Sequence, residues 1–269
     1  MKYLIACDLD GSLLNKDSEL TKNTINTLRK LDKMGHIVVL VTGRPFQGAI
    51  AFYNQLEIKT PLIVDNGATI ENPSNKDFPV QKTYIPVHLL HELFKFSKPF
   101  LESAFFSDDK TVYAYRHSSV LTSYFTGSPM NNVIETEFDK IDIAPSGLVF
   151  LVHEKNRLDL ENYIDSNFNQ VLAHRYWGTT HGYSVYEIYL RQVSKSTGIK
   201  YLLDYYNLSY DNVLAFGDGV NDLEMIRDAR LGVALKNAIT PVINVAKDVT
   251  KYDHDNEGVH KYLVEFFNL

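Results

Sequence analysis

The sequence predicts an α/β protein in which a parallel sheet, covered by helices on both faces, is interrupted by an inserted domain. Two observations support this prediction. Apolar β-branched runs alternate with helical patterns over residues 3–64 and again over residues 195–233. Between them, the pattern changes to aromatic and β-branched segments that follow a stretch of turn residues. We therefore expect a core of residues 1–83 and 191–269 around an insertion of residues 84–190.

The elements of the first core segment can be read in order. Tyr3 to Cys7 is an apolar run typical of a buried strand, and Thr21 to Met34 has the apolar spacing of an amphipathic helix that Gly35 closes. His36 to Val41 is a second β-branched run, and Pro45 suits the first turn of a following helix. A strand, a helix and a strand in this order predict neighbouring parallel strands.

The later elements follow the same reasoning. Within the insertion, Thr111 to Tyr115 and Leu148 to His153 have the composition of strands. The core pattern returns with a helix that begins near Lys195, and the apolar run Asn212 to Phe216 predicts another strand. Val259 to Phe267 predicts a closing amphipathic helix.

Two carboxylates, Asp8 and Asp10, stand one residue apart at the end of the first predicted strand, directly before Gly11. Alternation along a strand aims residues i and i+2 the same way, so we expect the two acids to share one small site. Like charges this close are tolerable when a divalent cation lies between them or when one carboxyl keeps its proton. Both conditions suit phosphoryl chemistry. The simpler alternative is a strand end with an Asx turn that solvates its acids.

A second acidic cluster, Asp218 to Asp222, follows the strand predicted over residues 212–216 and precedes another helical pattern. In an open parallel sheet, ligands collect outside the carboxyl ends of the strands. We therefore expect the two acidic clusters, distant in the sequence, to converge at one edge of the sheet.

Two further segments offer groups that bind phosphate. Thr42 and Gly43 follow the second predicted strand, where a hydroxyl and free backbone N–H groups are available for phosphate oxygens. Lys195 places an ammonium at a helix N-terminus, which is unfavourable for the helix dipole and indicates a role toward a ligand. Taken singly, Thr42 also fits a plain N-cap, and Lys195 a solvated surface lysine.

Together and in this order, the four segments resemble the four motifs of the haloacid dehalogenase superfamily of phosphohydrolases. The similarity is greatest to its Cof-like branch, which carries a C2B-type cap. Three more segments are similar to that branch, Leu62 to Ala68, Gly232 to Ala238 and Asn256 to Val259. Ser12 stands where the family usually has Thr, which keeps the hydroxyl. The resemblance implies a Rossmann-like three-layer core with a parallel sheet and an inserted α+β cap domain that selects the substrate.

The resemblance also implies an activity, the Mg²⁺-dependent hydrolysis of a small phosphomonoester, either a sugar phosphate or a phosphorylated cofactor, through a phosphoaspartate. Asp8 would be the nucleophile and a Mg²⁺ ligand, and Asp10 the general acid and base, with its backbone carbonyl on the metal. Asp218 would be the third metal contact, and Asp222 would orient the metal shell. Lys195 would act in catalysis by offsetting the charge of Asp8 and of the phosphoryl group. The residues implied in phosphate binding are Leu9, Thr42, Gly43, Lys195 and Asn221.

Three other functions use similar residues. A phosphomutase of the same superfamily forms the same phosphoaspartate, and a non-catalytic sugar-phosphate binding or sensing protein would keep the pocket. The binder predicts a replacement at Asp8, Asp10, Lys195 or Asp218, but all four are present. A phosphate-accepting regulatory domain would not need an insertion of about a hundred residues, the size of a small domain. The phosphatase is therefore favoured, with the phosphomutase and the binder as alternatives.

Composition agrees with this reading and argues against some partners. A chain of 269 residues with 45% hydrophobic content can bury sizeable cores, and a net charge of −6 argues against a nucleic-acid backbone as the partner. The single cysteine, Cys7, fits a reducing compartment, and no apolar stretch approaches a membrane span. We expect a cytoplasmic protein that binds neither nucleic acid nor membrane. The sequence leaves open the oligomeric state, the physiological substrate and the cap residues that contact it.

Overall fold

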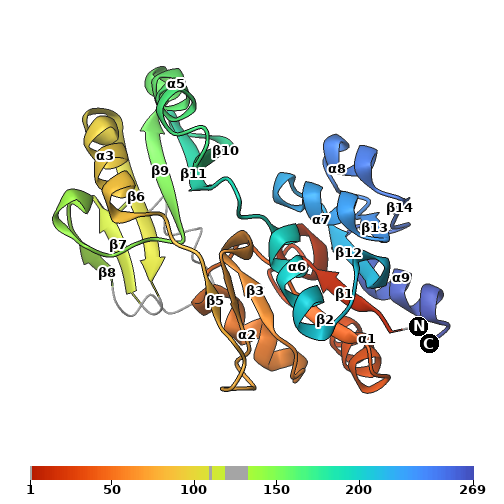
Figure 1. Cartoon of the computed structure of the whole chain (residues 1–269). Helices are drawn as coiled ribbons and strands as arrows, with labels where there is room; N and C mark the ends of the chain where they lie inside the picture. Colours follow the sequence, from red (N-terminus) through yellow and green to blue (C-terminus); the bar gives the residue numbers. More distant parts are fainter. Residues whose placement is uncertain (1, 109–110, 119–132) are drawn as a thin grey trace. The chain divides into compact units, whose positions relative to one another are not determined.

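The computed structural model describes residues 2–108, 111–118 and 133–269, and the chain divides into two compact units (Figure 1). The first, called the core unit below, comprises Met1–Pro45, Ala49–Gln81 and Ser194–Leu269. The second, called the cap unit, comprises Phe46–Gly48 and Lys82–Val193. Each unit therefore joins segments that are separated in the sequence.

The core unit is organised around a five-stranded parallel sheet with the strand order β14-β13-β12-β1-β2. Its strands are β1 (Leu4–Cys7), β2 (Ile37–Leu40), β12 (Val213–Gly217), β13 (Leu231–Ala234) and β14 (Asp248–Val249). Cys7 pairs with Phe216 on one side and with Leu40 on the other. The carboxyl ends of β1, β2 and β12 therefore lie side by side, which is where the sequence places its polar motifs.

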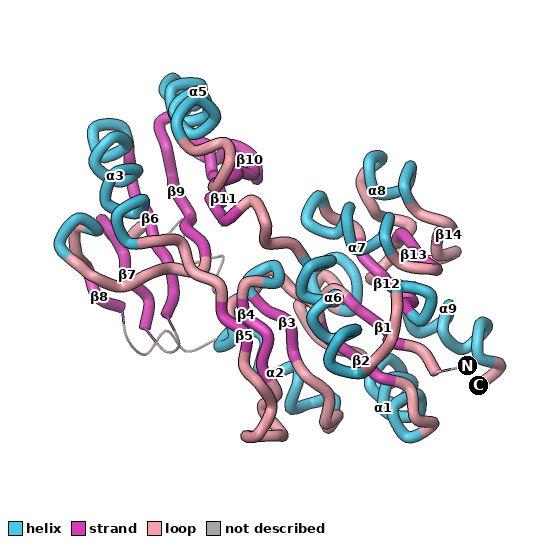
Figure 2. The backbone as a smooth tube through the Cα atoms, in the orientation of Figure 1, coloured by secondary structure: helices cyan, strands magenta, loops and turns pink. Residues whose placement is uncertain are grey.

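Helices cover both faces of this sheet, so the core unit has three layers (Figure 2). They are α1 (Lys22–Lys33), α2 (Phe46–Leu56), α6 (Lys195–Tyr206), α7 (Leu223–Asp228), α8 (Thr240–Val245) and α9 (Gly258–Phe267). Successive strand residues point to opposite faces. Ala215 belongs to the hydrophobic cluster formed with α6, α7 and α8. Its neighbour Phe216 instead meets the ring of Tyr262 in α9, with 5.4 Å between ring centroids.

A second, three-stranded sheet extends the core unit at the end of β2. It contains β3 (Leu62–Val64), β4 (Thr69–Glu71) and β5 (Gln81–Lys82) in that order. A parallel bridge between Val41 and Ile63 connects β3 to the residue that follows β2. The turn Asp65–Gly67 between β3 and β4 has positive φ at three successive residues.

The cap unit contains a six-stranded sheet with the order β10-β11-β9-β6-β7-β8, antiparallel except for the pair β7 and β8. Its strands are β6 (Leu101–Asp108), β7 (Thr111–Tyr115), β8 (Val133–Glu135), β9 (Gly147–His153), β10 (Leu172–Thr180) and β11 (Tyr183–Leu190). The helices α3 (Val87–Ser97) and α5 (Arg157–Asn167) lie on one face of this sheet (Figure 1). On that face, the hydroxyl of Tyr186 contacts Glu161 of α5, and Phe94 of α3 packs edge-on against Tyr115.

The predicted fold class is confirmed, with a parallel α/β core and an additional, mainly antiparallel sheet. The predicted helix after Thr21 is α1, and the hydroxyl of Thr21 caps it by accepting the N–H of Thr24 at 3.2 Å. The closing helix is α9, and two of the predicted strands of the insertion are β7 and β9. Across the described residues, none of the helices has both the length and the apolar character needed to cross a bilayer.

Candidate active site

The loop after β1 begins the site. Asp8 directly follows the strand and is 4% exposed, because it lies between the ends of β2 and β12. Gly11 in the same loop has a φ of +73°, and a Cβ atom there would lie 2.3 Å from Oδ2 of Asp218. A side chain at position 11 would therefore separate the β1 loop from the β12 loop. The glycine allows the two acidic loops to touch.

Three carboxylates meet where these loops touch. Asp8, Asp218 and Asp222 each offer an oxygen, and these oxygens all lie within 4.8 Å of one another. Asp222 is fully buried, and its Oδ2 accepts the backbone N–H groups of Asp218 at 3.0 Å and Gly219 at 2.9 Å. The expected convergence of the two acidic clusters is therefore present in the structure.

Lys195 supplies a positive charge to this cluster. Its side chain is fully buried, and Nζ donates to Oδ1 of Asp8 at 2.5 Å and to Oδ1 of Asp222 at 2.6 Å. Lys195 is the first residue of α6, and the N-terminus of α6 packs against the β3–β4 turn. A Cβ atom on Gly67, where φ is +101°, would lie 2.1 Å from the carbonyl oxygen of Ser194. Only glycine allows this approach, which brings the lysine into the site.

The electrostatics of the cluster are dominated by burial and by excess negative charge. Burial raises the pKa of Asp8 well above its usual range, Lys195 opposes this rise, and the charges of Asp222 and Asp218 add to it. Burial, followed by the charge of Asp222, raises the pKa of Asp218 to about 6. For Lys195, burial lowers the pKa, but Asp222 and Asp8 more than offset it, so the pKa lies above its ordinary value. One ammonium therefore faces three carboxylates.

This donor set fits a metal ion. Carboxylate oxygens are the ligands that hard divalent cations prefer, and a bound cation would offset the charge that Lys195 leaves unbalanced. Ser12, which is buried, donates its hydroxyl to Oδ1 of Asp218 at 3.1 Å and so fixes the orientation of that carboxylate. The three carboxylate oxygens lie close enough together to share one ion.

Asp10 lies in a different environment from Asp8. Its carboxylate is 56% exposed and accepts two hydrogen bonds from Arg44, at 2.8 Å from Nε and 2.6 Å from the second terminal nitrogen. The guanidinium of Arg44 also lies over the ring of Phe52, 5.1 Å from its centroid. The carboxylates grouped with Asp8 are thus those of Asp218 and Asp222. Strand alternation had instead led us to expect the side chain of Asp10 beside Asp8. The loop turns at Asp10 and Gly11, which are not in helical or continuous strand conformation.

The segment after β2 lies beside the Asn-Gly turn that follows β3. Thr42 is fully buried, and its hydroxyl oxygen accepts the N–H of Arg44 at 3.0 Å, so the hydroxyl proton can still be donated. Gly43 lies against two amides, because a Cβ atom there would be 3.0 Å from Oδ1 of Asn66 and 3.3 Å from Nδ2 of Asn221. Asn221 donates to Oδ1 of Asn66 at 2.9 Å. Leu9, also expected near phosphate, has a fully buried side chain, which leaves its backbone as the polar group.

Among the residues that the structure describes, four that sequence reasoning missed contact the predicted site. Arg44 holds Asp10, Ser12 holds Asp218, Asn66 holds Asn221, and Asn237 lies 3.5 Å from Asp218. Arg44 and Ser12 are sequence neighbours of predicted site residues, which was an available signal. Asn66 and Asn237 occur in two of the three further segments on which the family resemblance rests, but without an assigned role.

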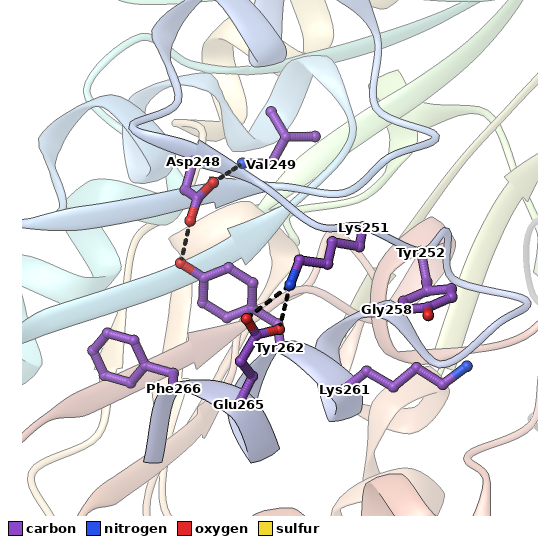
Figure 3. A pocket seen from close by; sticks show the side chains of 9 residues that line it. All are labelled: Asp248, Val249, Lys251, Tyr252, Gly258, Lys261, Tyr262, Glu265 and Phe266. Atoms are coloured by element: carbon purple, nitrogen blue, oxygen red, sulfur yellow. Dashed lines mark hydrogen bonds and ion pairs between the residues drawn. The ribbon is translucent and has the colours of Figure 1, made fainter. Parts of the chain in front are cut away.

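One hollow in the core unit has no part in this site. It has a volume of about 270 Å³ and lies between the β14 region and α9 (Figure 3). Its polar groups pair with one another: Tyr262 donates to Asp248 at 2.7 Å, and Lys251 contacts both oxygens of Glu265 at 2.7 and 2.8 Å. Ligand pockets usually begin near 300 Å³, so this hollow is small. None of the predicted site residues lines it.

Comparisons with known proteins agree with this geometry. Residues 5–263 match the family of haloacid dehalogenase-like hydrolases. A curated relative is the 5-amino-6-(5-phospho-D-ribitylamino)uracil phosphatase YitU of Bacillus subtilis (strain 168), which is 30% identical over 268 residues, covering 99% of this chain and 98% of that protein. The chain belongs to the haloacid dehalogenase-like hydrolase family. Its enzymatic class is that of the family's phosphatases, which use a metal ion.

Solved structures show the same fold. A haloacid dehalogenase-like hydrolase from Bacteroides thetaiotaomicron superposes with a TM-score of 0.84 at 23% identity, covering 99% of this chain and all of that one. The subclass IIB sugar phosphatase BT4131 superposes with a TM-score of 0.80 at 20% identity, and each chain is covered in full. The family match over residues 5–263 and the relative from Bacillus subtilis, together with this shared fold, confirm the Cof-like resemblance.

Proposed function

We propose that this protein is a Mg²⁺-dependent phosphatase that hydrolyses small phosphomonoesters through a phosphoaspartate on Asp8. The observation that carries the proposal is the buried contact of Lys195 with Asp8 and Asp222, beside the carboxylate of Asp218. One ammonium offsets the charge of one carboxylate, whereas Lys195 lies beside three carboxylates. The excess of negative charge supports a site that binds a cation and, through it, a phosphate.

Asp8 is the nucleophile in this proposal. Lys195 holds Oδ1 of Asp8, which leaves Oδ2 to attack phosphorus. A bond forms between this oxygen and phosphorus while the bond from phosphorus to the leaving oxygen breaks. Asp10, protonated and released from its contact with Arg44, gives its proton to that oxygen, and the product alcohol leaves. In the second step Asp10 takes a proton from water, the water oxygen attacks phosphorus, and the bond to Asp8 breaks to release phosphate.

The metal site comprises the carboxylates of Asp8 and Asp218 and the backbone carbonyl of Asp10, with Asp222 orienting the shell. Mg²⁺, when bound, supplies positive charge to the phosphoryl oxygens and to the attacking carboxylate. Asp222 is held by two backbone N–H groups and by Lys195, so it fixes the loop that carries Asp218. Pre-positioned charges of this kind are what the hydrolysis of a phosphate monoester requires, since the uncatalysed reaction is extremely slow.

The phosphoryl group is bound by the proton of the Thr42 hydroxyl, the backbone of Gly43 and Leu9, the amide of Asn221 and the ammonium of Lys195. Asn66 supports this arrangement by orienting the amide of Asn221. The close contact of Gly43 with both amides explains why a larger residue is unsuitable there. These groups are hydrogen-bond donors, as a phosphoryl group requires.

The substrate is a sugar phosphate or a phosphorylated cofactor precursor. This proposal is supported by the name of the Bacillus subtilis relative, whose substrate joins a phosphorylated ribityl chain to a uracil ring, and by the cap's supply of polar and aromatic side chains. A location in the cytoplasm, without nucleic-acid or membrane partners, belongs to the same proposal and is supported by the net charge of −6 and the single buried cysteine.

The role of Asp10 leads to a prediction about leaving groups. Asp10→Asn cannot donate a proton, so the variant should lose activity on an alkyl phosphate by about a hundredfold or more, and much less on 4-nitrophenyl phosphate, whose leaving group needs no proton. Steady-state rates of both substrates at saturating Mg²⁺ measure the difference. Equal losses on the two substrates would remove Asp10 from the acid's role.

The test of the proposed function is phosphate release from a broad panel of phosphomonoesters, with Mg²⁺ and with chelator, using wild type and Asp8→Asn in parallel. We expect release that requires the metal and that disappears in the variant. An isomerised sugar phosphate in place of free phosphate would identify a phosphomutase. A folded, Mg²⁺-loaded protein that binds sugar phosphates without turning them over would identify the non-catalytic binder.

A further inference from the structure

Asn237, just after β13, connects three loops of the core unit. Its Nδ2 donates to the carbonyl oxygen of Gly11 at 2.8 Å and lies 3.5 Å from Oδ2 of Asp218. Its Oδ1 accepts the backbone N–H of His254 at 3.0 Å. One amide side chain therefore contacts the β1 loop, the β12 loop and the turn before α9.

The turn before α9 is itself fixed by local hydrogen bonds. Oδ1 of Asp253 accepts the backbone N–H of Asn256 at 3.0 Å and its side-chain amide at 2.8 Å, and the N–H of Gly258 reaches the carbonyl of Asp253 at 2.9 Å. The turn also contacts the β1 loop a second time, because Nδ1 of His254 lies 2.8 Å from the carbonyl oxygen of Leu14. The turn behind Asn237 is therefore held by hydrogen bonds within itself and to the β1 loop.

The partners of Asn237 explain why an amide is needed. The carbonyl of Gly11 and the carboxylate of Asp218 are both acceptors, so they do not attract each other, yet Gly11 lies in contact with Asp218. The N–H₂ group of Asn237 donates to the carbonyl of Gly11 and lies beside Oδ2 of Asp218, the carboxylate oxygen that Ser12 does not contact. The oxygen of the same amide is satisfied by His254, which fixes which end of the amide faces the acids.

We propose that Asn237 is a positioning residue for the metal site, which holds the Gly11 loop and the Asp218 carboxylate in the arrangement that binds the divalent cation. The inference rests on the proposed function, since it assigns the cation site to Asp8 and Asp218. Asn237 does not contact the reacting atoms in this account. It acts by keeping the two acidic loops in register before the cation arrives, as residues behind a metal ligand commonly do.

The experiment measures Mg²⁺ binding by calorimetry without substrate, and the Mg²⁺ dependence of phosphate release, for wild type, Asn237→Ala and Asn237→Asp. Both variants should bind Mg²⁺ about ten- to a hundredfold more weakly. Asn237→Asp keeps the acceptor for His254 but places an acceptor against Gly11 and Asp218, so its loss should be at least as large as that of alanine. At saturating Mg²⁺, kcat should return to near the wild-type value in Asn237→Ala.

Asn212 offers a matched control. Its Nδ2 donates to the carbonyl of Lys2 at 3.0 Å and its Oδ1 accepts the N–H of Ser209 at 3.3 Å, at the amino ends of β1 and β12. Asn212→Ala should cost similar folding stability and leave Mg²⁺ affinity unchanged. An Asn237→Ala protein that binds Mg²⁺ as tightly as wild type would overturn the inference. This holds even if its melting temperature falls as far as that of the Asn212→Ala control.

The design separates this inference from the proposed function. Calorimetry reports on the cation site whether or not the correct substrate has been found. Weaker Mg²⁺ binding in Asn237→Ala supports the positioning role even if every phosphate ester tested is inert. Metal-dependent phosphate release in wild type together with unchanged Mg²⁺ affinity in the variant would keep the phosphatase and reject the role of Asn237.

Discussion

The core unit and the cap unit each bury charged side chains, but they balance them differently. In the core unit, Lys195 contacts Asp8 and Asp222, and Asp218 lies beside them. In the cap unit, Arg175 and Glu187 on neighbouring strands form a pair of opposite charges at 2.6 Å, and each side chain is only 11% exposed. A pair of opposite charges balances, whereas three acids with one lysine leave an excess of negative charge that a bound cation or a retained proton can offset. The ligand site is therefore marked by its imbalance of charge, and burial alone does not distinguish it.

The largest expected effect is the loss of catalysis in Asp8→Asn, without a loss of stability. Asp8→Asn keeps the shape of the side chain but is a poor nucleophile and metal ligand, so kcat should fall by about three orders of magnitude or more. The melting temperature of the metal-free variant should equal or exceed that of wild type, because a repelling charge has been removed. Activity assays and thermal unfolding in chelator measure the two effects. Wild-type rates in this variant would disprove the mechanism.

Replacing the basic side chain in each of the two buried clusters tests the comparison directly. Lys195→Met leaves buried carboxylates without their partner and should destabilise the core unit by about 3–5 kcal/mol in metal-free solution. Arg175→Met leaves Glu187 buried and should destabilise the cap unit by a smaller amount. Denaturant unfolding measures both, with the single tryptophan, Trp177 in β10, as the reporter for the cap unit.

A second substitution in each unit sharpens the test. Adding Glu187→Leu to Arg175→Met removes the buried carboxylate and should restore most of the cap unit's stability. Adding Asp222→Asn to Lys195→Met should restore less, because Asp8 and Asp218 remain together. Equal recovery in the two units would mean that the core cluster is no more unbalanced than the cap pair.

The next effect concerns the pH dependence of the metal-free protein. The pKa of Asp218 is raised from 3.8 to about 6, so the folded state keeps this proton at pH values where the unfolded chain has lost it. The free energy of unfolding should therefore fall as pH rises through about 4 to 6. Asp218→Asn removes the cost of ionising this buried carboxyl group. The variant should therefore be more stable than wild type at pH 8, by on the order of 2 kcal/mol, with little difference at pH 4. Greater stability of wild type at pH 8 in chelator would contradict this prediction.

The smallest effect is expected at Glu137 of the cap unit, which is partly exposed and contacts Lys98 and Lys140. Hydrogen bonds from Lys140 and Lys98 lower the pKa of Glu137 from 4.5 to about 2. The stability from this group is present above the unfolded pKa and is lost as pH falls toward 2. Glu137→Gln should therefore lose less stability on acidification than wild type, as measured by Trp177 fluorescence. The variant Glu154→Gln, which changes another exposed cap glutamate, should follow wild type.

The core unit was predictable because local patterns carry its architecture. The apolar runs before Asp8, Thr42 and Asp218 mark strand ends, and parallel topology brings such ends to one edge. The cap unit was predictable only as a class, since the order β10-β11-β9-β6-β7-β8 depends on pairings between segments far apart in the sequence. Composition shows that strands are present but does not specify which of them are neighbours.

Within the site, the residues that directly follow strands could be predicted from the sequence. The residues whose roles depend on tertiary contacts could not. The Asp8–Lys195 contact joins residues 187 positions apart, and the family resemblance supplied what periodicity could not. The pairing of Asp10 with Arg44 was not expected, because strand alternation was assumed to extend as far as Asp10. Asn66 and Asn237 were not assigned because their roles depend on how turns pack against one another.

The central claim is that the phosphoryl group passes through Asp8. The most direct measurement is intact and peptide-level mass spectrometry on enzyme quenched in acid during turnover, comparing wild type, Asp10→Asn and Asp8→Asn. The account predicts an acyl phosphate on Asp8, present at a higher level in Asp10→Asn and absent in Asp8→Asn. Phosphate release without any adduct, or an adduct that persists in Asp8→Asn, would contradict it.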